Sequence, residues 1–207
     1  MATHLAPRRE MTLREFEAKY AGKRYEYVDG RAVPMGPEII GDKGEVTVAA
    51  TKSEHGLVVD VCQFAVSSFV REHKLGRVFG AETGFIMRED THEIRAADIA
   101  FVASERLRFV ERGEWLPFPP DLAIEVISEY DTARDIRQKA EAYMKNGTRL
   151  LWMVYSDQRI IDVHRPGQPI VTLSVDDTLD SGDVLPGFSA SVRTIFSALD
   201  ALGSQSR

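Results

Sequence analysis

The sequence contains a single cysteine, Cys62, among its 207 residues, so no disulfide framework can form within the chain. The setting of this cysteine, VDVCQFAV, predicts a buried helical position and not a reactive thiol. No stretch approaches the roughly 20 consecutive apolar residues of a membrane span. The first ten residues, MATHLAPRRE, also lack the apolar segment of a secretory signal. We therefore expect a cytoplasmic protein with no membrane part.

The sequence also has no excess of basic residues. The chain has 26 Lys and Arg against 32 Asp and Glu, a net charge of −6, which argues against broad, non-specific adhesion to nucleic acid. A metal-dependent nuclease remains compatible with this balance, because carboxylates that hold a divalent cation count as negative charges. The sequence has no zinc-ligand cluster, phosphate-binding loop or basic stripe with interleaved aromatic residues, so it predicts no target for such an enzyme.

What is present is an ordinary globular composition, with 43% hydrophobic residues. A chain of this length can bury roughly 70% of its extended surface and can support its own core. We expect one domain over residues 11–201, with flexible extensions at 1–10 and 202–207.

The first half of the chain begins with a predicted helix over 11–20, in which Thr12 is the N-cap and Glu15 completes a capping box. Two short β-rich runs then flank Asp29 and Gly30, which predicts a two-residue type I′ hairpin. The Gly- and Pro-rich segment 34–44 predicts a loop. Residues 45–73 predict a long, mostly helical segment that Gly76 ends. Its apolar stripe consists of Val58, Val61, Cys62, Ala65, Phe69 and Val70.

The second half alternates strands and helices. Strands are predicted over 77–81, 83–87, 97–102, 121–127, 149–155 and 159–165. A polar turn is expected over 88–91, a loop over 104–120 and a turn over 156–158. A helix capped by Ser128 or Asp131 should run to Asn146, and Gly147 should close it. A short amphipathic helix near the end carries Val192, Ile195, Phe196 and Leu199. This order predicts a mixed α/β sheet protein.

Two carboxylates stand in apolar strands. Alternation along 121–127 places Ala123, Glu125 and Ile127 on one face, and burying a carboxylate there costs several kcal/mol unless a cation, a proton or hydrogen bonds compensate it. Asp98 stands at the start of the strand ADIAFV. A structural ion pair for Glu125 and a strand-entry turn for Asp98 are the alternatives. Together, two carboxylates on one sheet face suit a hard cation such as Mg²⁺.

Lys139 lies in the predicted helix that follows the Glu125 strand. The apolar stripe of this helix consists of Ala133, Ile136, Ala140, Tyr143 and Met144. Lys139 stands at the edge of that stripe, one turn before Tyr143, so it can point along the sheet towards Glu125. The alternative is an ordinary surface lysine that lies along apolar neighbours.

These residues resemble a PD-(D/E)XK nuclease site in which the lysine has moved from the triplet Glu125–Ile127 to the next helix. More closely, the chain is similar to the Uma-two family, whose members are described as putative restriction endonucleases. The matching stretches are YEYVDGRAV, ADIAFV, PPDLAIEVISEYDTARDIRQKAEAYMKNG, LLWMV and LPGF. The resemblance implies a restriction-endonuclease-like mixed β-sheet core flanked by helices, with an N-terminal helix and β-hairpin.

The resemblance also implies an activity and roles for residues. It implies hydrolysis of phosphodiester bonds in DNA that depends on Mg²⁺, with Mn²⁺ as a substitute. From this function we also expect a homodimer, because cutting two strands needs two centres. Asp98, Glu125 and the carbonyl of Val126 would hold the metal, and Lys139 would complete the catalytic set. The expected supporting residues are Glu26, His55, Glu82 and Tyr143, for which a cross-strand charge, a surface position or core packing are the alternatives.

The chain departs from the family pattern at three places. Ala97 replaces the usual proline before Asp98, Ile127 stands at the lysine position of the triplet, and Tyr155 and Ser156 stand where an aspartate often follows the Trp152 strand. The departures at Ala97 and Ile127 keep open a nuclease-fold protein that binds nucleic acid or a protein without cutting. The acidic balance and the lack of a separate DNA-reading module keep open a hydrolase of a small phosphorylated substrate.

Overall fold

The computed structural model of the protein describes residues 10–88 and 93–202. The extensions expected at 1–10 and 202–207 therefore lie outside the described residues, apart from Glu10 and Leu202. The polar turn expected over 88–91 also lies outside them, apart from Arg88.

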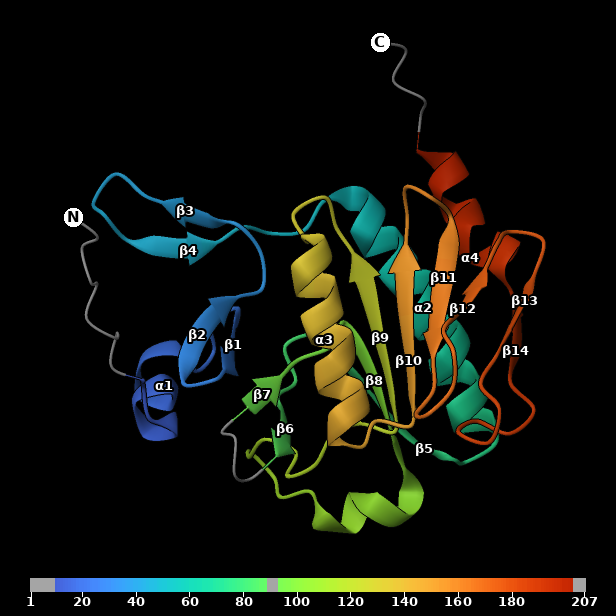
Figure 1. The fold of residues 1–207 in the computed structure, drawn as a ribbon, viewed down its shortest axis with the longest axis horizontal. Coiled ribbons are helices and arrows are strands. Elements are labelled where there is room, and N and C mark those ends of the chain that lie inside the picture. Colours follow the sequence, from blue (N-terminus) through green and yellow to red (C-terminus); the bar gives the residue numbers. More distant parts are fainter. Residues whose placement is uncertain (1–9, 89–92, 203–207) are drawn as a thin grey trace.

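A six-stranded mixed sheet forms the centre of the fold, in the order β12-β11-β10-β9-β8-β5 (Figure 1). Its strands are β5 (Gly76–Gly80), β8 (Ile99–Ala103), β9 (Leu122–Ile127), β10 (Leu150–Tyr155), β11 (Ile160–His164) and β12 (Val171–Leu173). The pair β9–β10 is parallel, and the other neighbours in this sheet are antiparallel. Helix α3 (Ala133–Asn146) makes the crossover between β9 and β10 that a parallel pair requires.

Helices cover both faces of this sheet. Helices α2 (Ser53–Glu72) and α4 (Val192–Ser197) pack on the face that carries Leu122, Ile124 and Val126. Helix α3 packs on the opposite face, against Ala123 and Ile127. The predicted alternation along this strand is therefore confirmed. The face beneath α3 is also the face of Glu125.

A second, four-stranded sheet lies beside the central one, in the order β2-β1-β7-β6. Its strands are β1 (Tyr25–Val28), β2 (Arg31–Pro34), β6 (Phe85–Arg88) and β7 (Glu93–Arg95), and α1 (Leu13–Tyr20) precedes them. The predicted capping box of Thr12 and Glu15 is present. Asp29 and Gly30 have φ angles of 48° and 71°, as a type I′ turn requires, so the predicted hairpin is confirmed.

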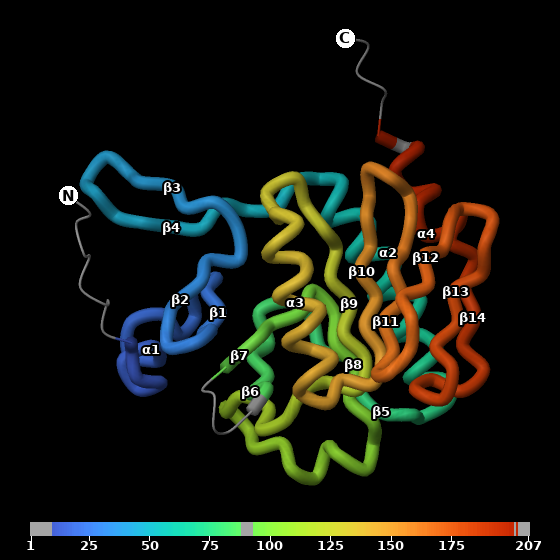
Figure 2. The backbone as a smooth tube through the Cα atoms, in the orientation of Figure 1, coloured from blue at the N-terminus to red at the C-terminus, as the bar shows by residue number. Residues whose placement is uncertain are grey.

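A small two-stranded hairpin, β3 (Glu38–Ile40) and β4 (Val46–Val48), stands off the body of the protein (Figure 2). We call residues 38–48 the arm. The loop predicted over 34–44 and the helix predicted from residue 45 are both wrong here, since α2 begins at Ser53. The β-branched run Val46–Val48 pairs across the tight turn that Gly41 and Gly44 allow, before any helical stripe begins.

Several element ends differ from the prediction. Lys74, with a φ angle of 56°, follows α2 in the left-handed region, whereas Gly76 begins β5. A Cβ on Gly76 would lie 2.0 Å from the carbonyl oxygen of Val102, so close approach of strands explains this glycine. Thr132, not Ser128 or Asp131, caps α3, and Gly147 closes that helix as predicted. The expected loop 104–120 begins with the 3-10 helix η1 (Ser104–Phe109).

Besides the arm, several short strands were not predicted. They are β7, β12 and the C-terminal pair β13 (Thr178–Asp180) and β14 (Ser189–Ser191). The final predicted helix is divided into α4 and the 3-10 helix η2 (Ala198–Ala201), with Val192, Ile195 and Phe196 buried. Among the residues that the structure describes, no helix is long and apolar enough to cross a membrane.

Candidate functional site

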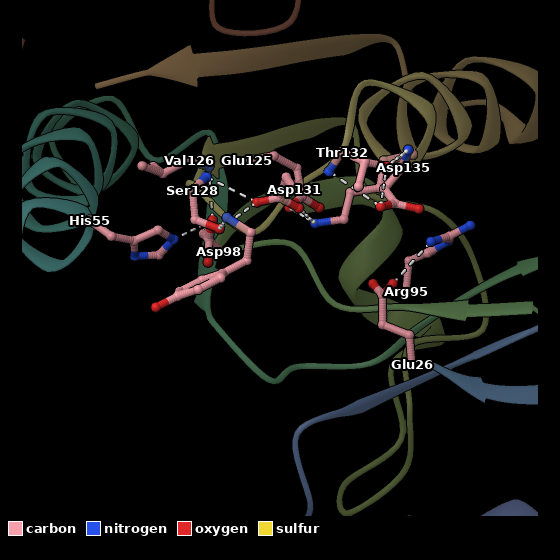
Figure 3. Close-up of polar contacts among 12 residues, drawn as sticks. Glu26, His55, Arg95, Asp98, Glu125, Val126, Ser128, Asp131, Thr132 and Asp135 are labelled. Carbon is pink, nitrogen blue, oxygen red and sulfur yellow. Dashed lines mark hydrogen bonds and ion pairs between the residues drawn. The ribbon is translucent and has the colours of Figure 1, made fainter. Parts of the chain in front are cut away.

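Asp98 and Glu125 come together where β8 and β9 meet. Ile99 pairs with Ile124, so the residue before Ile99 lies beside the residue after Ile124. Asp98 Oδ2 accepts a 2.8 Å hydrogen bond from the backbone N–H of Val126 (Figure 3). Both acids line a cavity of about 480 Å³, whose other wall includes Glu26 on β1. The cavity therefore lies between the two sheets, with Asp98 and Glu125 on the central one.

Glu125 is a buried carboxyl group with an altered pKa. Burial raises its pKa to about 7, since removal from water disfavours the charged form, and the charges of Asp98 and Glu26 act in the same direction. The ammonium group of Lys139 opposes this rise. Tyr143 donates a 2.8 Å hydrogen bond from its hydroxyl to Glu125 Oε1. Near neutral pH, Glu125 is therefore poised between its neutral and ionised forms.

Lys139 reaches Glu125 from α3. Its Nζ lies 3.3 Å from Glu125 Oε2 and 3.4 Å from Asp131 Oδ1. Burial alone would lower the pKa of Lys139, but the surrounding carboxylates, Glu125 foremost, raise it above its usual value. The ammonium group therefore stays charged at neutral pH. Ile127, which stands at the lysine position of the family triplet, packs in the apolar cluster beneath α3.

Asp131 is a site residue that the sequence interpretation missed, because it was assigned there to helix capping. Its Oδ2 accepts hydrogen bonds from the backbone N–H of Ser128 at 2.9 Å and from the Ser128 hydroxyl at 2.7 Å. Its Oδ1 faces Lys139. Burial would raise the pKa of Asp131, but Lys139 and the Ser128 bonds lower it. The available signal was a Ser-x-x-Asp turn directly after the Glu125 strand, which pointed as well to a cap as to a site.

His55, on α2, approaches the acids from the other side of Asp98. Its Nε2 lies 3.3 Å from Asp98 Oδ2. Burial alone would lower the pKa of His55, but the hydrogen bond and charge of Asp98, with smaller contributions from Asp131 and Glu125, raise it. The histidine is therefore a polar neighbour of Asp98 and not an exposed helix residue.

Glu26 lines the cavity but has partners of its own. Its Oε1 accepts a 3.0 Å hydrogen bond from the backbone N–H of Ala96, and its Oε2 lies 3.0 Å from a guanidinium nitrogen of Arg95. Arg95 also pairs with Glu93 at 2.8 Å. Glu26 therefore joins β1 to β7 through a buried ion network, and its charge acts on Glu125 and Lys139 from across the cavity.

Glu82 is not brought to this cluster. Its side chain is exposed and lies 3.4 Å from Arg24 Nε. It lines a shallower neighbouring pocket that also touches Asp98 and His55. Of the seven side chains singled out from the sequence, the other six line the cavity or contact Glu125 directly.

The donor set suits a magnesium ion better than a softer metal. Asp98 and Glu125 supply carboxylate oxygens, the adjacent Val126 also lines the cavity, and Mg²⁺ takes few protein oxygens and keeps several waters. No group of three or more His, Cys, Asp and Glu side chains with metal-binding geometry occurs within residues 10–88 and 93–202. A cation here would offset the cost of ionising the buried Glu125, so the residues fit a sparsely liganded Mg²⁺.

The mixed central sheet with helices on both faces defines a restriction-endonuclease-like fold. Residues 12–193 match the Uma2 family, which is described as "Putative restriction endonuclease", and the chain belongs to this family. The predicted family and the restriction-endonuclease-like fold are confirmed.

A solved structure has the same architecture. The chain is similar to the crystal structure of a "putative nuclease belonging to DUF820" from Anabaena variabilis ATCC 29413, with a TM-score of 0.74 and 21% sequence identity. The likeness covers 91% of this chain and 99% of that one. At this identity it shows the fold alone. The comparison with curated proteins found no match.

Proposed function

We propose that this protein is a metal-dependent endonuclease that hydrolyses phosphodiester bonds in DNA at the cluster of Asp98, Glu125 and Lys139. The single observation that carries the proposal is the position of Lys139. Its ammonium group lies 3.3 Å from Glu125 although the triplet has isoleucine in the lysine position. A positive charge beside the two acids is what a nuclease of this class requires, and Lys139 supplies that charge from α3.

Each residue has a defined task in this proposal. Asp98, Glu125 and the Val126 carbonyl would hold one Mg²⁺ or Mn²⁺. When bound, such an ion polarises a phosphate oxygen and lowers the pKa of a water molecule. Lys139 supplies positive charge where negative charge develops on the phosphate. Tyr143 and His55 hold one oxygen each of Glu125 and Asp98, and thereby orient the two carboxylates.

The test is the nicking of supercoiled plasmid by the purified protein with Mg²⁺ or Mn²⁺. We expect Asp98→Ala and Glu125→Ala each to lower the nicking rate by a factor of about 100 or more, as loss of a transition-state contact does. Asp183→Ala is the matched control, because Asp183 is an exposed acid paired with Arg149. If the two site variants nick plasmid as fast as wild type, the proposed site is wrong.

The charge of the cavity favours a small phosphodiester as a second candidate substrate. Its lining includes three cationic side chains, Arg24, Arg95 and Lys139. The acids Glu26, Asp98, Glu125, Asp131 and Asp135 outnumber them. A long nucleic-acid backbone gains little electrostatic attraction from a lining in which acids outnumber bases, whereas a single phosphate group can reach Lys139. Rates on plasmid, single strands and a generic phosphodiester separate the candidates, and the absence of Mg²⁺ or Mn²⁺ binding by calorimetry at millimolar concentration would favour a non-cutting protein.

A further inference from the structure

The arm is an unusual element, because little of its surface is buried. All three residues of β3 are exposed, and so are two of the three in β4. Ile40 is 74% exposed, Ile39 53% and Val46 47%. Among the described residues, β3 and β4 pair with each other and with no further strand. The Tyr25 hydroxyl ties the arm to the body by a 2.7 Å hydrogen bond to Glu38 Oε1. A two-stranded hairpin with so little buried surface is marginally stable in water, so we expect a further surface to cover it.

The free edge of β3 has backbone groups ready to pair. Gly41 N–H donates to the Glu45 carbonyl at 2.8 Å, and Ala49 N–H donates to the Pro37 carbonyl at 2.8 Å. In an antiparallel ladder every second residue points inwards, so Ile39 pairs inwards with Thr47. The N–H and carbonyl groups of Glu38 and Ile40 therefore point outwards. In Figure 1, β3 is the strand of the arm that lies farther from α1 and β2.

The charge of the arm argues against nucleic acid as the partner that covers it. Its charged side chains are Glu38, Asp42, Lys43 and Glu45, three acids against one base. Phosphate groups would be repelled by this balance. A strand edge, by contrast, is complementary to itself, because two copies of one strand related by a two-fold axis pair antiparallel.

We propose that β3 pairs antiparallel with β3 of a second copy of this chain, with Ile39 opposite the partner's Ile39 on a two-fold axis. This register places Glu38 opposite the partner's Ile40. Both residues point outwards, so each such pair can exchange two backbone hydrogen bonds. A shift in one direction would place Glu38 opposite the partner's Glu38. A shift in the other would place it opposite the partner's Asp42, and like charges in direct opposition destabilise a sheet.

The consequence is a continuous four-stranded sheet across two molecules. Pro37 and Thr51, which lie on the chain just before and after the arm, line the cavity that holds Asp98 and Glu125. Dimerisation through the arm therefore ties one wall of each cavity to the partner molecule. It also brings two sites into one particle, which cutting both strands of a duplex requires.

Sedimentation velocity of the full chain, without nucleic acid or metal, tests this inference over a wide concentration range. Wild type should sediment with twice the chain mass of 23.2 kDa. Ile39→Lys and Ile39→Glu should each be monomeric, because each places like charges together on the two-fold axis. An equimolar mixture of these two variants should recover the dimer. Ile40→Pro should be monomeric as well, since it removes an outward N–H and none inside the hairpin.

Phe64→Lys is the matched control, because Phe64 is an apolar residue on α2 that is 73% exposed. It should dimerise like wild type. A monomeric wild type at all concentrations, a dimeric Ile39→Lys, or a mixture of the charge variants that stays monomeric would overturn the pairing. A Phe64→Lys variant that dissociates to the same extent would also overturn it. None of these results bears on phosphodiester hydrolysis, so the dimer and the proposed function can fail separately.

Discussion

At the scale of single residues, Glu125 combines a buried carboxyl group with a raised pKa. The apolar strand that holds it buries the carboxyl group, while Lys139 and Tyr143 hold that group in place. Sequence alternation predicted the burial. The hydrogen bond from Tyr143 and the contact with Lys139 came from the packing of α3, which no local pattern specifies.

The raised pKa of Glu125 gives a testable dependence of stability on pH. Its pKa in the folded protein, about 7, lies above the ordinary value of 4.5. As the pH rises between these values, the unfolded chain loses this proton first, so the metal-free fold loses stability. Glu125→Gln cannot ionise. Between pH 5 and pH 8 it should therefore lose about 2 kcal/mol less unfolding free energy than wild type.

Denaturant unfolding of both proteins at the two pH values, in the presence of a chelator, measures this difference. Comparison of the variant with wild type cancels the titration of other groups. Equal losses of unfolding free energy in the two proteins would mean that Glu125 is already ionised at pH 5. The charge of Lys139 would then offset the rise in pKa that burial causes.

At the scale of elements, the turn between β9 and α3 contains two neighbouring residues, Asp131 and Thr132, with different roles. Thr132 caps α3 in a box with Asp135. Asp131 instead lies 3.4 Å from the ammonium group of Lys139, which also contacts Glu125. The sequence contained both residues at capping distance, and only their contacts distinguish the cap from the residue that positions the lysine.

Two variants should distinguish the helix cap from the residue that positions Lys139. Thr132→Ala should lower the unfolding free energy by about 1 kcal/mol and leave plasmid nicking near the wild-type rate. Asp131→Asn should slow nicking roughly tenfold or more, because Lys139 loses one of its two anchors, while stability changes less. Melting curves and nicking rates on the same preparations decide this. If activity simply follows stability in both variants, Asp131 supports the loop and not the lysine.

At the scale of the whole molecule, apolar packing holds the fold together. Three apolar clusters join the helices to the two sheets. The described part of the chain contains no structural metal cluster. A catalytic ion of millimolar affinity adds well under 1 kcal/mol near its dissociation constant, unlike a structural zinc ion.

Removal of divalent metal should therefore abolish nicking and leave the fold in place. We expect excess EDTA to lower Tm by about 1–2 °C, and Mg²⁺ to restore activity in full. Scanning calorimetry with and without EDTA measures the first change, and plasmid nicking after addition of Mg²⁺ measures the second. A fall of tens of degrees would show a structural metal.

The sequence by itself determined what depends on neighbouring residues along the chain. The capping box at Thr12, the type I′ turn at Asp29–Gly30, the two faces of β9 and the closure of α3 at Gly147 all follow from local sterics and short hydrogen bonds. The mixed α/β class followed from the order of such elements.

Tertiary structure decided what depends on distant partners. The arm was predicted as loop and helix because two three-residue strands carry too little periodic signal. Glu82 was grouped with the acids, yet its exposed side chain pairs with Arg24 and does not line the main cavity. Lys139, Asp131 and His55 meet the acids because α2 and α3 pack on opposite faces of one sheet, and that packing energy is spread over residues far apart in the chain.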